Sequence, residues 1–259
     1  IPRYDRLTDL SSNGNLRSAV WKYGPQKRFL SIYKITKDQV FKNTKMNLNV
    51  SYQNVEESRI NRNFGSSKLN SRIEKVSVIA LSSDFTTKIN QANLTYGVDI
   101  YRDGLQSTAF QENILTGAET DLDTRYPDGN NSTLRAEGFV SFSDNFTPEV
   151  SYNISARAGY SYLKSEMDTN FFNLPFTAIE QHNTTYSGAF GIVNNPTKNI
   201  KLAFNLASAY RVPNIDDMAK IFESTPGLLI VPNENIKPEK TVTADVSVTL
   251  WDGNRFQFE

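Results

Sequence analysis

Few residues of this sequence could do chemistry in a catalytic or metal site. The chain has one histidine, His182, and no cysteine, so a histidine cluster and a thiolate site are both excluded. Two carboxylate pairs, Asp121/Asp123 and Asp216/Asp217, stand among Asn, Gly and Thr residues, as solvated turn residues do. Glycine-rich phosphate loops and nucleophile motifs are also missing from the sequence. We therefore expect a protein that is not an enzyme, with no resident cofactor and no metal site.

The remaining candidates for binding a ligand are loop residues. Tyr126, Phe171, Phe172 and His182 fall in two stretches, 102–132 and 164–184, whose composition predicts long loops. Exposed aromatic side chains there could contact a ligand or partner, and the alternative is that they pack loops against each other. For His182 the alternatives are an exposed loop residue and an iron ligand, because neutral imidazole binds iron well.

Composition narrows the class of protein. The 28 basic and 28 acidic residues balance, and no run of Lys and Arg predicts a nucleic-acid partner. No stretch approaches the roughly 20 apolar residues of a membrane helix, and the first residues do not read as a signal peptide. The mean hydropathy of −0.48 is low for a chain with 16 Phe and 12 Tyr. A barrel with a wet lumen fits that combination, because half of its strand positions are polar.

Alternating patterns predict about ten strands, and the gaps between them alternate in length. The strands are expected at 27–36, 45–57, 72–83, 88–101, 133–143, 149–163, 185–194, 199–211, 240–251 and from 255 onward. Tight turns are expected at 37–44, 84–87, 144–148, 195–198 and 252–254, and long loops at 58–71, 102–132, 164–184 and 212–240. Short turns at one rim and long loops at the other are typical of an outer-membrane barrel. Residues 1–23 show no alternation and are expected to form a loop.

The faces of these strands agree with a membrane-spanning sheet. In 150–162 the even positions are apolar or aromatic and the odd positions are polar or small, and 46–53 repeats the pattern. The predicted fold class is therefore all-β: an antiparallel up-and-down transmembrane β-barrel, partial, with about ten strands of a larger barrel. A sheet of a soluble β-rich binding protein, buried on one face, is the alternative.

The stretch 208–239 joins two such strands. Pro213 removes a backbone donor and ends the first strand, and Asn214 can cap one helical turn with Asp216 and Asp217 at its positive end. The apolar residues of that turn share a face: Ile215, Met218, Ile221 and Phe222.

Two motifs at the ends of this stretch resemble the late-barrel signature of TonB-dependent outer-membrane receptors. In that family a strand ends in Phe-Arg-Ala-Pro, and the chain returns through Asn-Pro-Asn-Leu-Lys-Pro-Glu. Here the sequences are Tyr-Arg-Val-Pro at 210–213 and Asn-Glu-Asn-Ile-Lys-Pro-Glu at 233–239, so four positions depart from the commonest letters. The residues that carry the motifs are Tyr210, Arg211, Pro213, Asn233, Asn235, Pro238 and Glu239.

Three segments near the start, 1–9, 21–28 and 52–59, resemble the early barrel of the haemoglobin/haem branch of the same family. That resemblance implies a plugged barrel of roughly twenty-two strands in the bacterial outer membrane. Residues 1–259 would be a single segment of that barrel, with the plug domain and the last strands absent. The implied partners are outer-membrane lipid, the TonB energy-coupling complex acting through the missing plug, and an iron or haem-type ligand.

The function that follows is uptake of an iron source, with haem as one candidate. Haem receptors of the resembling branch commonly place a histidine between the two motifs, but residues 214–232 contain none. Haem would then be bound weakly, held by the plug, or bound through His182. The alternatives are a non-energised outer-membrane barrel, such as a porin or adhesin, and a receptor for another cargo such as cobalamin.

Overall fold

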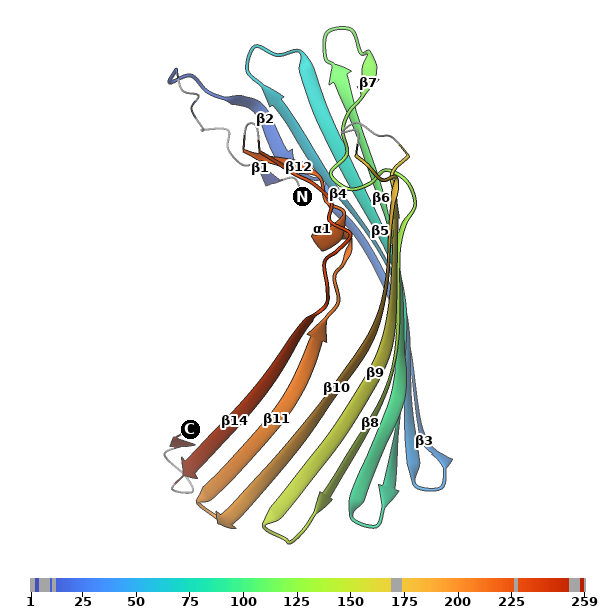
Figure 1. Ribbon diagram of the computed structural model, residues 1–259, viewed down its shortest axis with the longest axis vertical. Coiled ribbons are helices and arrows are strands. Elements are labelled where there is room, and N and C mark those ends of the chain that lie inside the picture. The colour runs from blue at the N-terminus through green and yellow to red at the C-terminus, as the bar shows by residue number, and fades with distance from the viewer. Residues whose placement is uncertain are drawn as a thin grey trace.

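The fold of the described residues is a curved antiparallel sheet of 13 strands, shown in Figure 1, with a separate two-stranded sheet beside it. The computed structural model describes residues 3–4, 10, 13–168, 174–225, 228–251 and 257–258. Consecutive strands pair as neighbours from β4 to β14, in the order β4-β5-β6-β8-β9-β10-β11-β14. The elements are β1 (Arg3–Tyr4), β2 (Ser18–Tyr23), β3 (Lys27–Phe41), β4 (Thr44–Asn63), β5 (Lys68–Ile89), β6 (Ala92–Asn113), β7 (Glu119–Asp121), β8 (Asn131–Asn145), β9 (Val150–Glu166), β10 (Ala178–Thr197), β11 (Ile200–Arg211), α1 (Ile215–Met218), β12 (Phe222–Thr225), β13 (Leu228–Ile230), β14 (Glu239–Trp251) and β15 (Gln257–Phe258).

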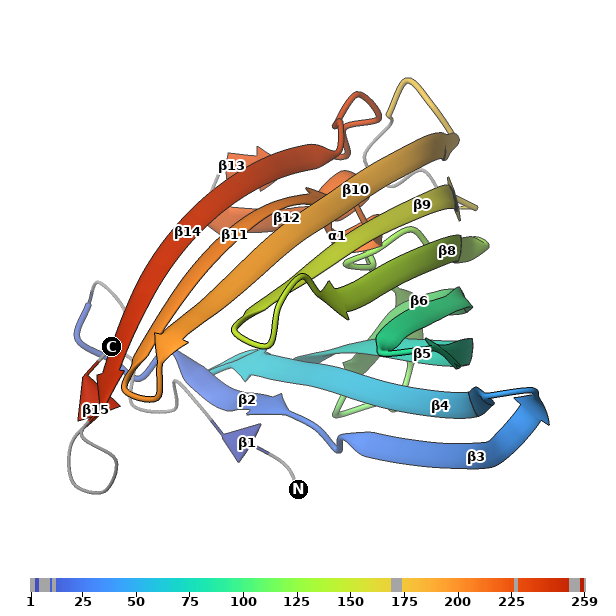
Figure 2. The same cartoon turned by 90° about the horizontal axis from the view of Figure 1, so that it is seen from below.

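The sheet curves like a wall of a barrel, and α1 and β12 lie on its concave side (Figure 2). Because side chains alternate along a strand, each strand has one row facing the concave side and one facing outward. On β9 the concave row includes Arg157, whose guanidinium lies 3.0 Å from Asp99 Oδ2 and 2.6 Å from Glu137 Oε2. The outward row includes Ile154, which is 53% exposed. The predicted separation into a polar inner face and an apolar outer face is confirmed.

The two rims differ as the sequence predicts. At the lower rim of Figure 1, strands are joined by residues 42–43, 90–91, 146–149 and 198–199. Asn43 and Asn90 have positive φ angles of 58° and 56°, which asparagine tolerates in tight turns. The long connection 212–238 leaves the sheet at the opposite rim, toward the upper part of Figure 1. By the usual asymmetry of outer-membrane barrels, the tight turns are periplasmic and the other rim is extracellular.

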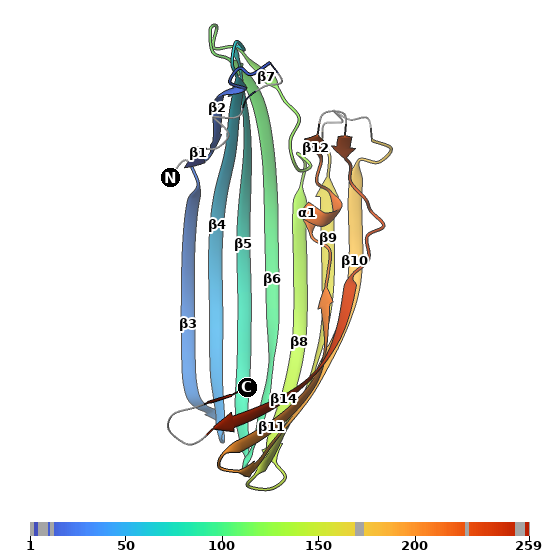
Figure 3. The same cartoon turned by 90° about the vertical axis from the view of Figure 1, so that its left-hand side faces the viewer.

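Several predicted boundaries are wrong because the strands run further at both ends than their apolar pattern. The predicted turn 84–87 belongs to β5, and the turn to β6 lies at 90–91. β5 and β6 each have 22 residues and stay paired from Lys68↔Asn113 to Ile89↔Ala92. The predicted loop 58–71 is therefore mostly strand, with only residues 64–67 between β4 and β5. A strand of about 9–11 residues crosses the bilayer, so roughly half of each long strand projects beyond it. Figure 3 shows these strands rising together past α1.

The first residues also differ from the prediction. The expected loop 1–23 contains β2, which pairs with the outer part of β4 from Ser18↔Asn63 to Tyr23↔Arg59. β3 then pairs with the rest of β4, from Lys27↔Glu56 to Phe41↔Thr44. Pro25 lacks an N–H group, so the ladder breaks between β2 and β3. Arg255, the expected start of the tenth strand, lies outside the described residues, and β15 pairs with β14 just after it.

Buried apolar side chains gather on the concave side beneath α1. The cluster joins wall residues to α1 and its neighbour: Leu105, Leu163, Met167 and Ile179 with Ile215, Met218 and Ala219. Elsewhere most strand residues are half-buried or exposed, as in a sheet with solvent or lipid on each face. Among the described residues, no helix is long and apolar enough to cross a membrane.

Candidate functional site

The site begins with the helical turn α1, which the sequence positions through its cap. Asn214 Oδ1 accepts a hydrogen bond from Asp217 N at 3.0 Å, and Asp217 Oδ2 accepts one from Asn214 N at 3.1 Å. This reciprocal pair is a capping box, and it satisfies two backbone donors that the helix start leaves free. The predicted cap at Asn214 is confirmed.

Apolar contacts hold this turn against the inner wall. Met218 is fully buried and Ile215 is 5% exposed, and both belong to the cluster with Leu105, Leu163 and Ile179. Burying a side chain of that size stabilises the contact by roughly 1.5–3 kcal/mol. The described residues of the connection 212–238 therefore fold into the concave side of the sheet and do not extend away from it.

Arg211, the last residue of β11, links the two ends of this connection. Its Nη2 donates to both Asp217 carboxylate oxygens at 2.6 and 2.8 Å, and its Nη1 donates to Glu239 Oε1 at 3.1 Å. Arg211 and Glu239 both belong to the motifs singled out in the sequence. The Arg211 side chain is 54% exposed, so these ion pairs are screened and each contributes little to stability.

A second inward loop, residues 122–130, contacts the first. Tyr126 donates its hydroxyl to Asp216 Oδ1 at 2.6 Å, and Ile221 N donates to Arg125 O at 2.9 Å. Lys220 Nζ lies 3.0 Å from Asp216 Oδ1. The carboxylates of Asp216 and Asp217 are thus engaged by named partners, so the expectation that they are merely solvated turn residues is wrong.

These contacts shift two pKa values. Burial, together with the hydrogen bond to the Asp216 carboxylate, raises the pKa of Tyr126 to about 12. For Asp216, burial acts to raise the pKa, but the Tyr126 hydroxyl and the Lys220 ammonium outweigh it and hold the pKa below its ordinary value. The phenol and the carboxylate therefore stay a donor and an acceptor over a wide pH range.

The loop 122–130 is itself fixed to the wall. Asn131 Nδ2 donates to the carbonyl oxygens of Pro127, Gly129 and Leu105, and Ser165 Oγ donates to Asn131 Oδ1 at 2.6 Å. Arg72 donates to both carboxylate oxygens of Asp123 at 2.9 Å. Asn131 is only 2% exposed. Asp123, expected to be solvated, is therefore a structural partner of Arg72.

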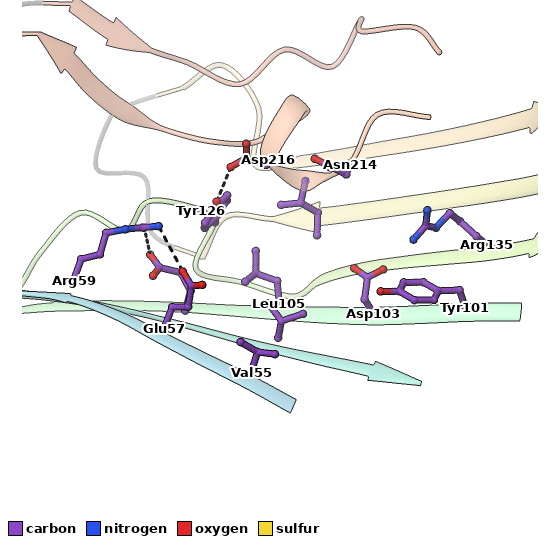
Figure 4. A pocket seen from close by; sticks show the side chains of 13 residues that line it. Val55, Glu57, Arg59, Tyr101, Asp103, Leu105, Tyr126, Arg135, Asn214 and Asp216 are labelled. Atoms are coloured by element: carbon purple, nitrogen blue, oxygen red, sulfur yellow. Dashed lines mark hydrogen bonds and ion pairs between the residues drawn. The ribbon is translucent and has the colours of Figure 1, made fainter. Parts of the chain in front are cut away.

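Two cavities lie between these loops and the wall, and Arg59 borders both. The first, of about 410 Å³, is shown in Figure 4. Glu57, Arg59, Asp103, Arg135 and Asp216 contribute charged groups to it. The second, of about 370 Å³, lies toward β2 and is bordered by Trp21, Tyr23, Arg72 and Arg125. No group of three or more His, Asp or Glu side chains suited to a metal ion occurs in the described part of the chain.

The two predicted ligand residues that the structure describes, Tyr126 and His182, do not come together. Tyr126 lies at the first cavity, on the concave side. His182 is not in a loop: it belongs to β10, opposite Tyr162, and its neighbour Gln181 reaches inward to Ile236 O. His182 therefore faces outward, where its ring stacks on Tyr162 at 4.7 Å and its Nδ1 lies 2.6 Å from the Tyr160 hydroxyl. Phe171 and Phe172 lie outside the described residues.

The motif residues make contacts that stabilise the fold around the connection 212–238. Pro213 is buried, and Asn233 N donates to Met218 O at 2.8 Å. Asn235 N donates to the Asn233 side chain at 2.9 Å. Tyr210 lies on the outward row of β11, with Lys240 Nζ 5.3 Å from its ring. Pro238 is half-buried just before β14, and the motifs thus frame the connection 212–238.

Sequence reasoning missed the charged residues of the wall, among them Arg59, Glu74, Asp103 and Arg135. They belong to parts of β4, β5, β6 and β8 that were expected to be loop or strand end. The available signal was their period of two: Val55, Glu57 and Arg59 continue the inner row of β4.

The paired strands, the apolar outer row and the inward loops define a segment of an outer-membrane β-barrel. Residues 2–259 match a protein family described as "TonB dependent receptor-like, beta-barrel". The chain belongs to that family, whose proteins lie in the outer membrane of Gram-negative bacteria. A comparison with curated protein sequences gives no match.

Solved structures share the fold at low sequence identity. The copper transporter OprC is 17% identical with a TM-score of 0.73, and the match covers 92% of this chain and 38% of OprC. The ferric yersiniabactin uptake receptor FyuA from Yersinia pestis is 12% identical with a TM-score of 0.56, over 96% of this chain and 37% of FyuA. The Serratia marcescens hemophore receptor HasR, solved with its hemophore HasA and heme, is 9% identical with a TM-score of 0.55, over 90% of this chain and 43% of HasR. The chain therefore spans less than half the length of these proteins.

Proposed function

We propose that this chain is part of a TonB-dependent receptor that takes up an iron source through the outer membrane. The observation that carries the proposal is the inward position of two loops, 122–130 and 212–238, joined by Tyr126 and Asp216 on the concave side. A loop fixed to the inner wall can contact a cargo inside the lumen and can change its position when the cargo arrives.

The proposal extends to the rest of the receptor. Residues 1–259 would form one segment of a larger plugged barrel, and the TonB energy-coupling complex would act through the plug. Membership of the family and the fold shared with metal and siderophore receptors support this reading. The coupling step is assigned to the whole receptor.

Haem is the cargo that the early segments of the sequence favour, and HasR, a hemophore receptor, is among the structures with the same fold. The inner wall supplies no histidine, because the sole histidine of the sequence is His182 and it faces outward. Haem would then be bound by Tyr or by residues of the plug, since phenolate is also an iron ligand in haem proteins. A receptor for another iron complex, or for cobalamin, would need no such ligand.

The test is growth and uptake by cells that express the full-length receptor and lack other iron receptors. With haem, a ferric siderophore or cobalamin supplied as the sole source, one cargo should be taken up, and uptake should stop when TonB is deleted. Uptake of every small solute without TonB would identify a porin and contradict the proposal. Binding to host surfaces without any uptake would identify an adhesin.

A further inference from the structure

The first cavity contains a buried carboxylate oxygen that nothing satisfies. Glu74, on β5, borders the cavity, and its side chain is only 7% exposed. Its Oε1 lies 3.5 Å from Arg59 Nη1, a long contact, while its Oε2 has no hydrogen-bond partner among the described residues. A buried acceptor without a partner costs about 1–3 kcal/mol, and more when it is charged. A hydrogen-bond donor from outside the described chain would remove this cost.

Arg59, the partner of Glu74 in this ion pair, also has an unsatisfied hydrogen-bonding group. Arg59 Nη2 lies 3.8 Å from Glu57 Oε2, and Arg59 Nε is buried without a hydrogen-bond partner in the described chain. The guanidinium is therefore shared between two carboxylates and saturates neither. A second cation at Glu74 Oε2 would not displace Arg59, since the two would bind different oxygens.

The charges around the cavity have an acidic excess. Four carboxylates border it, from Glu57, Glu74, Asp103 and Asp216, against two guanidiniums, from Arg59 and Arg135. The Asp216 carboxylate is already bound by the Lys220 ammonium and the Tyr126 hydroxyl, so its charge is compensated. Arg135 lies 4.5 Å from the centre of the Tyr101 ring and faces Asp103 (Figure 4). Three carboxylates thus remain for two guanidiniums on the cavity wall. Burial raises the pKa of the Glu74 carboxyl and outweighs the attraction of Arg72 and Arg125, which border the second cavity, so its charge is incompletely compensated.

The cavity is large enough for a group larger than a water molecule. One water molecule fills about 30 Å³ of liquid, whereas this cavity measures about 410 Å³, within the range of small-molecule sites. A metal ion does not fit the wall, because the described residues contain no group of three suitable ligands. An organic cation supplies both the charge and the N–H donors that Glu74 Oε2 lacks.

We propose that this cavity binds a guanidinium or ammonium group, which donates to Glu74 Oε2 beside Arg59. The inference rests on the proposed function, because the cation would be carried by the cargo that enters the lumen. The same chemistry could come from a basic side chain elsewhere in the whole receptor, and the experiment separates the two sources.

The experiment measures binding of butylguanidine to the full-length receptor in detergent, with the neutral isostere butylurea as the comparison. The wild type should bind butylguanidine, and Glu74→Gln should weaken that binding by roughly tenfold or more. Glu56→Gln is the matched control. Like Glu74, Glu56 is paired with basic side chains, here Lys27 and Lys75, but its side chain lies on the outward row of β4. Heat-modifiable migration of each variant verifies that the barrel is folded.

Three outcomes follow. Equal binding of butylurea, or equal binding of butylguanidine by wild type and a folded Glu74→Gln variant, overturns the inference. If the wild type binds neither probe, a structure of the full-length receptor decides: a Lys or Arg nitrogen within hydrogen-bond distance of Glu74 Oε2 supports the site with an internal source, and water alone overturns it. TonB-dependent uptake, measured separately, would survive the failure of this inference, whereas its absence would remove the proposed function itself.

Discussion

Tyr126 and Asp216 are 90 residues apart in the sequence, and the Tyr126 hydroxyl donates to Asp216 Oδ1 at 2.6 Å. This hydrogen bond joins the loop before β8 to the helical turn after β11.

Replacing Tyr126 by Phe removes the donor and leaves the ring. We expect the 212–238 connection to be held less tightly, by about 1–2 kcal/mol. Faster hydrogen exchange at the Met218, Ala219 and Ile221 amides would report this change. Tyr186→Phe, on the exposed outer face, is the control and should leave exchange unchanged.

The hydrogen bond between Tyr126 and Asp216 also predicts the pH range over which the loop is held in place. A tyrosine whose pKa is raised to about 12 stabilises the folded state fully below its ordinary pKa of 10 and loses that contribution as pH rises to about 12. Asp216 has a lowered pKa, so its contribution is present above its ordinary pKa of 3.8 and is lost as pH falls through the lower folded value. A spectroscopic titration of phenolate should show one tyrosine ionising near pH 12, and Tyr126→Phe should remove that step. A Tyr126 that ionises near pH 10 would contradict the buried hydrogen bond.

The ion pairs of Arg211 should hold the two ends of the connection together, and their strength should depend on the salt concentration. Arg211→Gln breaks its ion pairs with Asp217 and Glu239, and we expect the connection to dock slightly less tightly, because the pairs of a half-exposed side chain are screened by solvent. The loss should shrink at high salt, since screening already weakens the pairs. Lys201→Gln, on the same inner row of β11, is the matched control. Hydrogen exchange over residues 214–219 at low and high salt measures both variants.

The two rows of β11 should differ in their tolerance of charge. Phe204 lies on the outward row, opposite Val246, and an arginine there should cost roughly 2–4 kcal/mol near the bilayer midplane. Asn205 is on the inner row, opposite Asp245, where an arginine should cost much less. Folding of the full-length barrel into lipid vesicles, followed by denaturant titration, gives both values. Equal costs would refute the assignment of the faces.

His182 should be dispensable for haem. It faces outward between Tyr160 and Tyr162, so His182→Ala is expected to leave the Soret band and the haem affinity of the full-length receptor unchanged. The control is His182→Phe, which keeps an aromatic ring in the stack. A changed Soret band in both variants would return His182 to the list of ligands.

The sequence allowed the fold to be predicted where its pattern had a physical cause. Phe204 and Leu206 alternate with Asn205 and Ala207 because one row meets lipid and the other the lumen, so the strand could be recognised. Above the bilayer the outward row is no longer consistently apolar, since Ser58 and Ser71 alternate there with Ile60 and Ile73, and the pattern weakens although the pairing continues. Residues 58–63 of β4, 68–71 of β5 and 102–113 of β6 were therefore predicted as loops.

The site was less predictable, because it is made by contacts between distant segments. The cap at Asn214 could be predicted from neighbouring residues, whereas nothing local indicates that Tyr126 meets Asp216 or that Glu74 lies beside Arg59. His182 was expected in a loop because the polar run Glu180 to Thr185 resembles one, yet it continues β10 opposite β9. A single sequence carries no record of such long-range pairs.

The outward extension of β4, β5 and β6 affects how a molecule would approach the receptor. Paired strands resist bending far more than isolated loops, and β5 and β6 remain in register over 22 residues each. A molecule arriving from outside would first meet the projecting ends of β4, β5 and β6 on this side, and the fixed inward loops lie behind them (Figure 3). An approach to α1 from this side is therefore limited by paired strands that cannot easily move aside.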